Sequence, residues 1–149
     1  MSDEGPRFNQ VNLVVEDMEA AVAFYQALGM TVRFDGGEWP PGSGARHVAF
    51  DNGEGAIFEL DNPAMARIYH AGWRSPDPEA RTVLLGFSLP SREAVDETYQ
   101  ALVAAGHTGR QEPYDAFFGA RYAVVCDPAG NDVGLMSPID QRRRYTPQL

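Results

Sequence analysis

The sequence predicts an α+β fold in which two βαβββ modules form a curled mixed sheet around a cup. The first observation is that one order of elements, a strand, a helix and three strands, occurs twice along the 149 residues, with a spacing of about 75 residues. The second is that each copy opens with a strand followed directly by a capped helix. Each module leaves one sheet face to be covered, so two modules can enclose a shared ligand site.

The first module opens with a strand at residues 11–15, in which every second side chain is strongly apolar. Gln10 and Asn12 take the opposite face of this strand. Asp17 is the expected N-cap of a helix whose apolar side chains recur at helical spacing until Gly29 ends it. These residues form a strand–helix unit.

Three short β-rich runs, TVRFD, RHVAFD and GAIFELD, complete the first module, and Gly, Pro and Asn separate them. A looser segment follows, in which PAMARIYHAGW can form a short helix and RSPDPEA is a linker. We therefore place the first module at residues 1–62 and a connector at residues 63–81.

The second module, residues 82–138, repeats this order. TVLLGFSLP is a strand, and Ser91 caps a helix that ends before Gly106. The runs TGRQEP, ARYAVVCDP and NDVGLMSP supply three more strands. Residues 139–149 form a C-terminal tail, in which the basic run 142–144 is interpreted as a solvated end. The two modules together are expected to form one domain.

Composition and charge limit the classes of function. The hydrophobic fraction of 44% is that of an ordinary globular protein. The formal charge of −9 repels polyanions, so we expect neither nucleic acid nor an acidic membrane surface as a partner. No apolar run approaches the roughly 18 residues of a membrane span. A single cysteine, Cys126, excludes an intramolecular disulfide and favours a cytoplasmic location.

Three motifs resemble the vicinal oxygen chelate superfamily, which includes glyoxalase I, extradiol dioxygenases, fosfomycin-resistance enzymes and bleomycin-resistance proteins. They are NLVVEDMEAAVAFYQALGM, AIFEL and DPAGNDVGL. The resemblance covers nearly the whole chain, and the DPAGN turn together with FYQALGM is its most specific part. It implies the glyoxalase/bleomycin resistance fold, with paired βαβββ modules around a metal or ligand cavity, often in a homodimer.

The resemblance also implies four positions for metal ligands, in the first and the last strand of each module. Counting back from Asp17 places the first position at Gln10, and the AIFEL motif places the second at Glu59. The second module has Leu84 and Gly134 at its two positions, and neither side chain can bind a metal. A catalytic divalent site normally needs three or more protein ligands, so no metal cofactor is expected.

A divalent metal is the alternative. A register shift of two residues keeps the sheet face and brings in Asp132, which gives Gln10, Glu59 and Asp132 as the alternative metal ligands. His47 and His70 are further nitrogen donors, although a lone histidine is more often a structural residue. The protein would then be a glyoxalase-like lyase or isomerase, or a dioxygenase-related enzyme. A metal-free enzyme with Glu59 as catalytic general base is a third hypothesis.

The main hypothesis is a metal-free protein that sequesters a small molecule in the cup. Polar groups on the floor would orient the ligand, and aromatic groups on the rim would stack against it. The candidate ligand-binding residues are Gln10, Asn12, Trp39, His47, Glu59, Trp73, Tyr114, Phe117 and Phe118. Tyr69 is a further aromatic residue in the rim segments. The apolar walls of the cup favour a planar or aromatic ligand, and the acidic residues nearby favour one that is neutral or cationic. The expected assembly is a homodimer. As an equal alternative, Gln10 and Glu59 are vestigial, and strand neighbours or water satisfy their hydrogen bonds.

Overall fold

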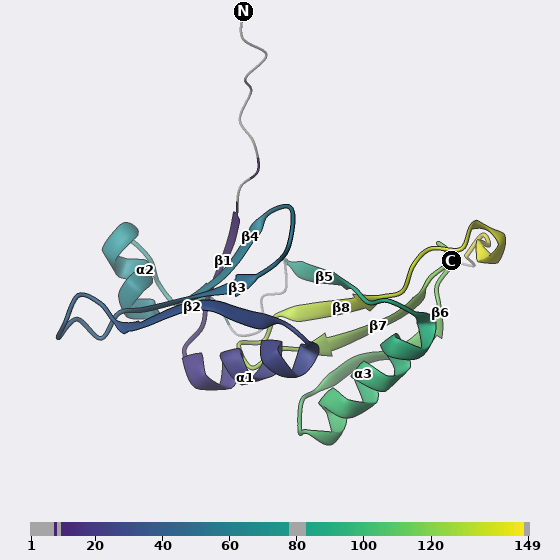
Figure 1. The fold of residues 1–149 in the computed structure, drawn as a ribbon, viewed down its shortest axis with the longest axis horizontal. Coiled ribbons are helices and arrows are strands. Elements are labelled where there is room, and N and C mark those ends of the chain that lie inside the picture. The colour runs from purple at the N-terminus through teal and green to yellow at the C-terminus, as the bar shows by residue number, and fades with distance from the viewer. Residues whose placement is uncertain (1–7, 9, 78–82, 148–149) are drawn as a thin grey trace, which may run out of the picture. The chain divides into compact units, whose positions relative to one another are not determined.

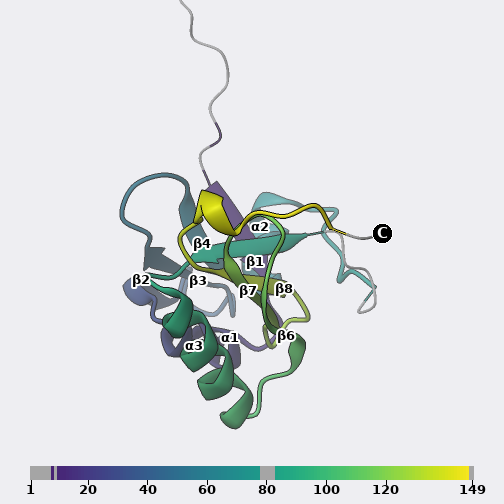
Figure 2. The same cartoon turned by 90° about the vertical axis from the view of Figure 1, so that its right-hand side faces the viewer.

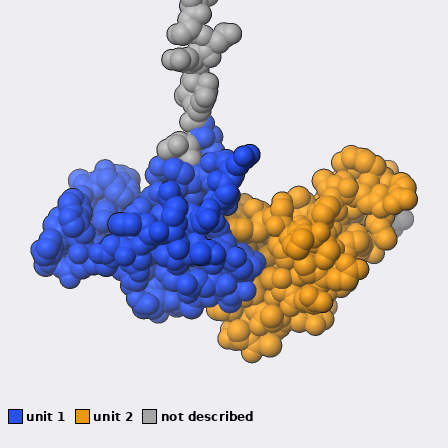
Figure 3. All heavy atoms as spheres, in the orientation of Figure 1, with its two compact units in different colours: residues 1–75 blue, residues 76–149 orange. Residues whose placement is uncertain are grey.

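The computed structural model describes residues 8, 10–77 and 83–147 and divides into two compact units, Met1–Ser75 and Pro76–Leu149 (Figure 3). Each unit contains a four-stranded mixed sheet, with strand order β1-β4-β3-β2 in the first and β5-β8-β7-β6 in the second. In both sheets the first strand pairs in parallel with the last, and the other pairs are antiparallel. The predicted α+β fold with two βαβββ modules is confirmed, and both sheets are open rather than closed.

The first unit contains β1 (Gln10–Val14), α1 (Met18–Leu28), β2 (Thr31–Glu38), β3 (Arg46–Asp51), β4 (Ile57–Asp61) and α2 (Pro63–Tyr69) (Figure 1). The helix α1 begins after Asp17, whose carboxylate accepts a hydrogen bond from the Ala20 N–H at 3.0 Å. It ends at Gly29, whose φ of 115° lies in the left-handed region that glycine adopts without steric cost. Both predicted helix ends are therefore confirmed.

One face of the first sheet packs against α1 and forms a hydrophobic core. Phe24 and Tyr25 of α1 are fully buried, and the Tyr25 ring lies 4.9 Å from the ring of Phe58 and 5.9 Å from that of Phe50, measured between centroids. Burial of each such side chain stabilises the fold by about 1.5–3 kcal/mol. Because side chains alternate along a strand, the neighbours of Phe58 on β4 face away from α1.

The second unit contains β5 (Leu84–Ser88), α3 (Arg92–Ala104), β6 (Gly109–Asp115), β7 (Arg121–Cys126), β8 (Asp132–Met136) and the 3-10 helix η1 (Gln141–Arg143). As predicted, Ser91 caps α3, because its hydroxyl accepts a hydrogen bond from the Ala94 N–H at 3.0 Å. Figure 2 shows α3 alongside the sheet, and its contacts are with β6, β7 and β8. Val95 and Leu102 of α3 are buried in this core.

The strand lengths and the connector refine the prediction. Strand β2 continues to Glu38, three residues beyond the predicted run, and the short helix of the connector ends at Tyr69. The predicted linker 74–80 and the first residue of the second module reach into residues 78–82, which lie outside the described residues. The helix η1 in the tail was not predicted. Within the described chain, no helix has the length and apolar character needed to cross a lipid bilayer.

Candidate functional site

The candidate site lies on the face of the first sheet that α1 leaves uncovered. The strand register pairs Asn12 on β1 with Glu59 on β4, and His47 on β3 with Asp61 on β4. Glu59 and Asp61 are two residues apart, so they share a face of β4. Three strands thus bring one amide, one imidazole and two carboxylates together.

Asp61 is the centre of this cluster. It is fully buried, and its Oδ1 lies 2.6 Å from His47 Nδ1. Its Oδ2 accepts two hydrogen bonds, from Asn12 Nδ2 at 2.8 Å and from the Tyr69 hydroxyl at 2.9 Å. A buried carboxylate is tolerated only when it is paired and hydrogen-bonded. Asp61 meets this requirement and fixes the orientation of three other side chains.

His47 links the two carboxylates of the cluster. Its Nε2 lies 3.2 Å from Glu59 Oε2, which also accepts a hydrogen bond from Asn12 Nδ2 at 3.1 Å. Both ring nitrogens therefore face carboxylate oxygens, and an imidazole that carries a hydrogen on each nitrogen satisfies both. Even with a positively charged His47, the two carboxylates leave the cluster with a net negative charge.

The residue after Asp61 places α2 beside the cluster. The Asn62 side chain accepts hydrogen bonds from the N–H groups of Met65 and Arg46, both at 3.0 Å. The first of these bonds caps α2, and Pro63 occupies the first position of the helix, where its missing N–H carries no cost. The cap thereby directs Met65 and Tyr69 toward the sheet face that carries Asp61.

A cavity of about 300 Å³ opens between this sheet face and α2. It is lined by Gln10, Asn12, His47, Asp61, Met65 and Tyr69. At its polar side, Gln10 Nε2 donates a hydrogen bond to Asn12 Oδ1 at 2.5 Å. The volume is at the lower end of the range for small-molecule sites. The cavity therefore combines polar groups from the sheet with a thioether and a phenol ring from α2.

Tyr69 is held in its protonated form by its surroundings. Burial of the hydroxyl, the hydrogen bond to Asp61 and the charges of Asp61 and Glu59 raise the pKa of Tyr69 to about 12. The residue as a whole is 57% exposed, so the ring remains accessible while the hydroxyl contacts Asp61. Tyr69 is thus a hydrogen-bond donor at neutral pH and offers an open aromatic surface.

The predicted rim residues divide between the two units. Trp39 lies between β2 and β3 and is 65% exposed, and Trp73 lies after α2 with the Arg67 guanidinium 5.3 Å from its ring centroid. Neither tryptophan lines the cavity. His70, at the end of α2, is exposed and lies outside the site.

The other three predicted aromatic residues belong to a cluster in the second unit. The ring of Phe118 lies 5.3 Å from that of Phe117 and 5.6 Å from that of Tyr122, and Tyr122 lies 6.2 Å from Tyr114. All of these pairs have the edge-to-face geometry that aromatic rings prefer. Tyr122, which joins the others, was not predicted.

The four implied metal-ligand positions do not fit a divalent ion. Glu59 Oε2 is already shared by His47 and Asn12, and Leu84 and Gly134 carry no donor atoms. A Cβ atom on Gly134 would lie 2.6 Å from the Tyr122 hydroxyl, so this phenol occupies the space over the glycine. The pKa of Tyr122 is raised mainly by burial of its hydroxyl and to a smaller extent by the neighbouring Tyr114 and Asp132.

The alternative ligand Asp132 has a different partner. It lies in the second unit, where its Oδ1 is 3.5 Å from Arg110 Nε. Among the residues that the structure describes, no three His, Cys, Asp or Glu side chains are grouped so that they could hold a metal ion. The described residues therefore do not present the set of metal donors that the resemblance implies.

Comparison with known proteins assigns the chain to a family. The model of the Glyoxalase/Bleomycin resistance protein/Dioxygenase superfamily matches residues 7–135. The chain belongs to this superfamily. The resemblance found in the sequence motifs is therefore confirmed. A search of the curated proteins found no match.

Solved structures of the glyoxalase/bleomycin resistance protein/dioxygenase superfamily are similar to the chain over most of its length. A member from Nocardioides is 26% identical with a TM-score of 0.68, covering 99% of this chain and 92% of its own. A family enzyme from Burkholderia phytofirmans is 24% identical with a TM-score of 0.70, covering 87% and 96%. A lactoylglutathione lyase from Agrobacterium tumefaciens is 23% identical with a TM-score of 0.59, covering 89% and 94%. The last two similarities establish the fold alone.

Two residues of the cavity were not predicted from the sequence. Asp61 lies two residues after Glu59, so the alternation along β4 could have identified it as a member of the same face. Met65 lines the cavity only because α2 packs beside the sheet, and local sequence patterns do not fix such a tertiary contact. Tyr69 was expected at the rim, but its hydrogen bond to Asp61 was not.

Proposed function

We propose that this protein binds a small planar molecule, neutral or cationic, in the cavity of the first unit, without a metal and without breaking a bond. The observation that supports this function is the closed hydrogen-bonding network of Asn12, His47, Glu59 and Asp61. The carboxylate oxygens in it face donors from the protein itself. They are therefore suited to orient a ligand by charge rather than to surround a metal ion.

The chemistry of the cavity defines the ligand class. Two carboxylates beside one imidazole attract a cation and repel an anion, and the effect is stronger in a partly buried site than in water. The Tyr69 ring and the Met65 thioether supply apolar surface on which a flat molecule can pack. Gln10, whose side chain is exposed, supplies an amide group at the opening.

A charge series of otherwise similar ligands tests this proposal. Benzylammonium, benzyl alcohol and benzoate present the same ring with positive, zero and negative charge. We expect affinity for this cavity, followed through the amide chemical shifts of its lining residues in NMR, to fall in that order, and the preference for benzylammonium over benzyl alcohol to shrink about tenfold in Asp61→Asn. Asp51→Asn is the matched control, because Asp51 is an exposed carboxylate of the same unit that does not line the cavity. Equal binding of all three ligands, or of none, would refute the proposal.

The competing function is a metal-dependent lyase or isomerase that uses Gln10, Glu59 and Asp132. Family membership favours it, together with the shared sheet face of Gln10 and Glu59. It predicts one tightly bound divalent ion per chain in protein purified without a metal-affinity tag, and loss of that ion in Glu59→Ala. Elemental analysis of both proteins decides between the two functions, since the binding-protein proposal expects no stoichiometric metal in either.

We also propose that the chain forms a homodimer. The resemblance to the superfamily supports this assembly, and light scattering of the purified protein tests it.

A further inference from the structure

A second cavity, of about 290 Å³, lies in the second unit at the turn between β6 and β7. Three small residues of this turn, Ala116, Gly119 and Ala120, line part of it. The remaining lining residues are polar or aromatic and come from three places: the start of α3, the end of β6 and the C-terminal segment. They are Arg92, Asp115, Arg143 and Tyr145.

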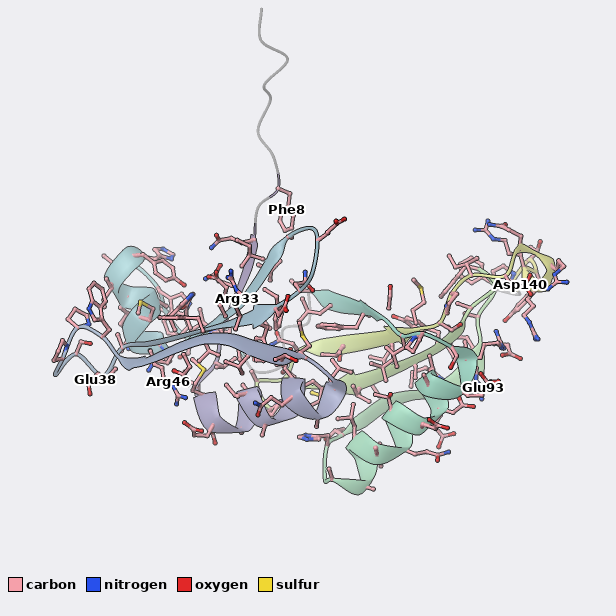
Figure 4. All side chains as sticks on the ribbon, viewed as in Figure 1. Phe8, Arg33, Glu38, Arg46, Glu93 and Asp140 are labelled. Carbon is pink, nitrogen blue, oxygen red and sulfur yellow. The ribbon has the colours of Figure 1, made fainter. Side chains whose placement is uncertain are left out.

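The C-terminal segment is fastened to the turn by backbone hydrogen bonds. The N–H of Asp140 donates to the Gly119 carbonyl and the N–H of Tyr145 to the Phe117 carbonyl, both at 3.0 Å. The Tyr145 hydroxyl donates to the Asp115 carbonyl at 2.8 Å. Figure 4 labels Asp140 in this segment. The cavity is therefore a defined feature of the unit and not a gap beside a loose chain end.

Gly119 makes this close approach of the two segments possible. Its φ of +94° favours glycine, and a Cβ atom at this position would lie 2.4 Å from the Asp140 carbonyl oxygen. Any other residue would push the C-terminal segment away from the turn.

Among the residues that line the cavity, two are cationic, Arg92 and Arg143, and one is anionic, Asp115, although the chain as a whole carries −9. Arg92 forms an ion pair with Asp115, and Arg121 Nη1 lies 3.3 Å from the same carboxylate oxygen. The single carboxylate of the cavity is thus shared by two guanidinium groups. Arg121 also pairs with Asp96 at 2.8 Å, and these hydrogen bonds raise the pKa of Arg121.

The arginines that line the cavity keep donors available. A guanidinium group has five N–H donors. Within residues 83–147, Asp115 is the only side-chain partner of Arg92, and Asp140 the only one of Arg143, with Arg143 Nε 3.7 Å from Asp140 Oδ2. Most of the N–H groups of both arginines can therefore bind a ligand.

We propose that this cavity binds the oxyanion group of a small molecule, a carboxylate or a phosphate. Forked guanidinium donors match both groups geometrically and form charge-assisted hydrogen bonds with them. The exposed ring of Tyr145 offers a surface for the rest of the molecule. This site lies in the other unit from the proposed cation-binding cavity and takes a ligand of opposite charge, so it does not depend on that function.

Titration at constant ionic strength with inorganic phosphate and with benzoate, followed by amide chemical shifts in NMR, tests the proposal. We expect saturable binding of one or both anions that Arg143→Gln weakens by about tenfold or more, as the loss of a charge-assisted hydrogen bond implies. Arg142→Gln is the matched control, because it removes the same charge from the same 3-10 helix. The Arg142 side chain is 90% exposed and does not line the cavity. We expect the control to change affinity by less than about twofold.

Several outcomes decide the result. Preference for phosphate or for benzoate would support the site and identify its oxyanion. Equal weakening by the Arg142 and Arg143 variants would overturn the proposal, because a diffuse positive field would then explain the attraction. If neither anion binds saturably, the proposal is also overturned. Arg92→Gln provides a second variant with the same expected loss if Arg143→Gln does not fold. Unchanged benzylammonium binding by Arg143→Gln separates this test from that of the first cavity.

Discussion

The open sheet faces of the two units have the same topology but different chemistry. In the first unit the register pairs Asn12 with Glu59 and His47 with Asp61. The corresponding pairs of the second unit are Gly86 with Gly134 and Tyr122 with Met136. Every polar group of the first network is thus replaced by a glycine, a thioether or a phenol ring.

This difference shows which part of a module the fold requires. In both units the strand face toward the long helix is apolar and buried, and that face holds the module together. The opposite face is freer to vary, because neither α1 nor α3 packs against it. The two modules thus share one packing arrangement but differ in their opposite faces, one of which carries carboxylates and the other aromatic rings.

The largest effect that separates the two faces is expected from Asp61→Ala. The substitution leaves His47, Asn12 and Tyr69 without their shared hydrogen-bond partner, and each buried polar group that is left unsatisfied typically costs about 1–3 kcal/mol. The corresponding change in the second unit, Met136→Ala, removes a half-buried side chain and should cost clearly less. Urea denaturation of both variants measures the two free energies of unfolding. A larger loss in Met136→Ala would show that the network is not a stabilising feature.

A smaller effect is expected at the glycine pair of the second unit. A Cβ atom on Gly134 would lie 2.6 Å from the Tyr122 hydroxyl and 3.1 Å from Leu84, whereas a Cβ atom on Gly86 meets nothing within 4 Å. Gly134→Ala should therefore destabilise the protein by about 1–3 kcal/mol, and Gly86→Ala should be close to neutral. The same denaturation experiment compares them.

The Tyr122 hydroxyl is the expected source of the stability loss in Gly134→Ala. Combining Gly134→Ala with Tyr122→Phe removes the shortest of these contacts, so the double variant should lose less stability than the sum of the two single variants. Strict additivity would mean that the glycine is required for another reason.

The smallest effect concerns the ionisation of two tyrosines. Burial is the largest cause of the raised pKa of both Tyr69, about 12, and Tyr122, but only for Tyr69 do Asp61 and Glu59 add to it. Asp61→Asn should therefore lower the pKa of Tyr69 and leave that of Tyr122 unchanged. Phenolate absorbance in an alkaline titration follows both groups, with Tyr69→Phe and Tyr122→Phe to assign them. Equal shifts of both tyrosines in Asp61→Asn would contradict the separate causes.

The same pKa of Tyr69 gives a pH dependence of stability. The folded protein holds the phenol proton more tightly than the unfolded chain, whose tyrosines titrate at 10.0. The stabilising contribution is therefore complete below pH 10 and is lost as the pH rises through about 12. The alkaline loss of stability should be smaller in Tyr69→Phe, and an unchanged pH profile would argue against the Tyr69–Asp61 bond.

The sequence was sufficient for the fold because local signals agree with it at each step. Asp17 and Gly29 bound α1, and Ser91 begins α3, since caps and turns act within a few residues of the chain. The site was predictable only in part: strand alternation placed Asn12 on the face of Gln10, and the family resemblance placed Glu59 through the AIFEL motif. The contact between the Tyr122 hydroxyl and Gly134 depends on the pairing of β7 with β8. The closure of the second cavity depends on the close approach of Gly119 to Asp140. Contacts between distant residues of this kind leave no local pattern.

The central claim is that the first cavity binds its ligand through the paired network of Asp61 without a metal. It is tested most directly by calorimetric titration of benzylammonium into protein dialysed against a strong chelator, with Asp61→Asn and Asp51→Asn compared after circular dichroism confirms their folding. We predict saturable binding that metal removal leaves unchanged, that Asp51→Asn retains and that Asp61→Asn weakens by about tenfold or more. Binding that disappears on chelation and returns with a divalent ion would contradict the account.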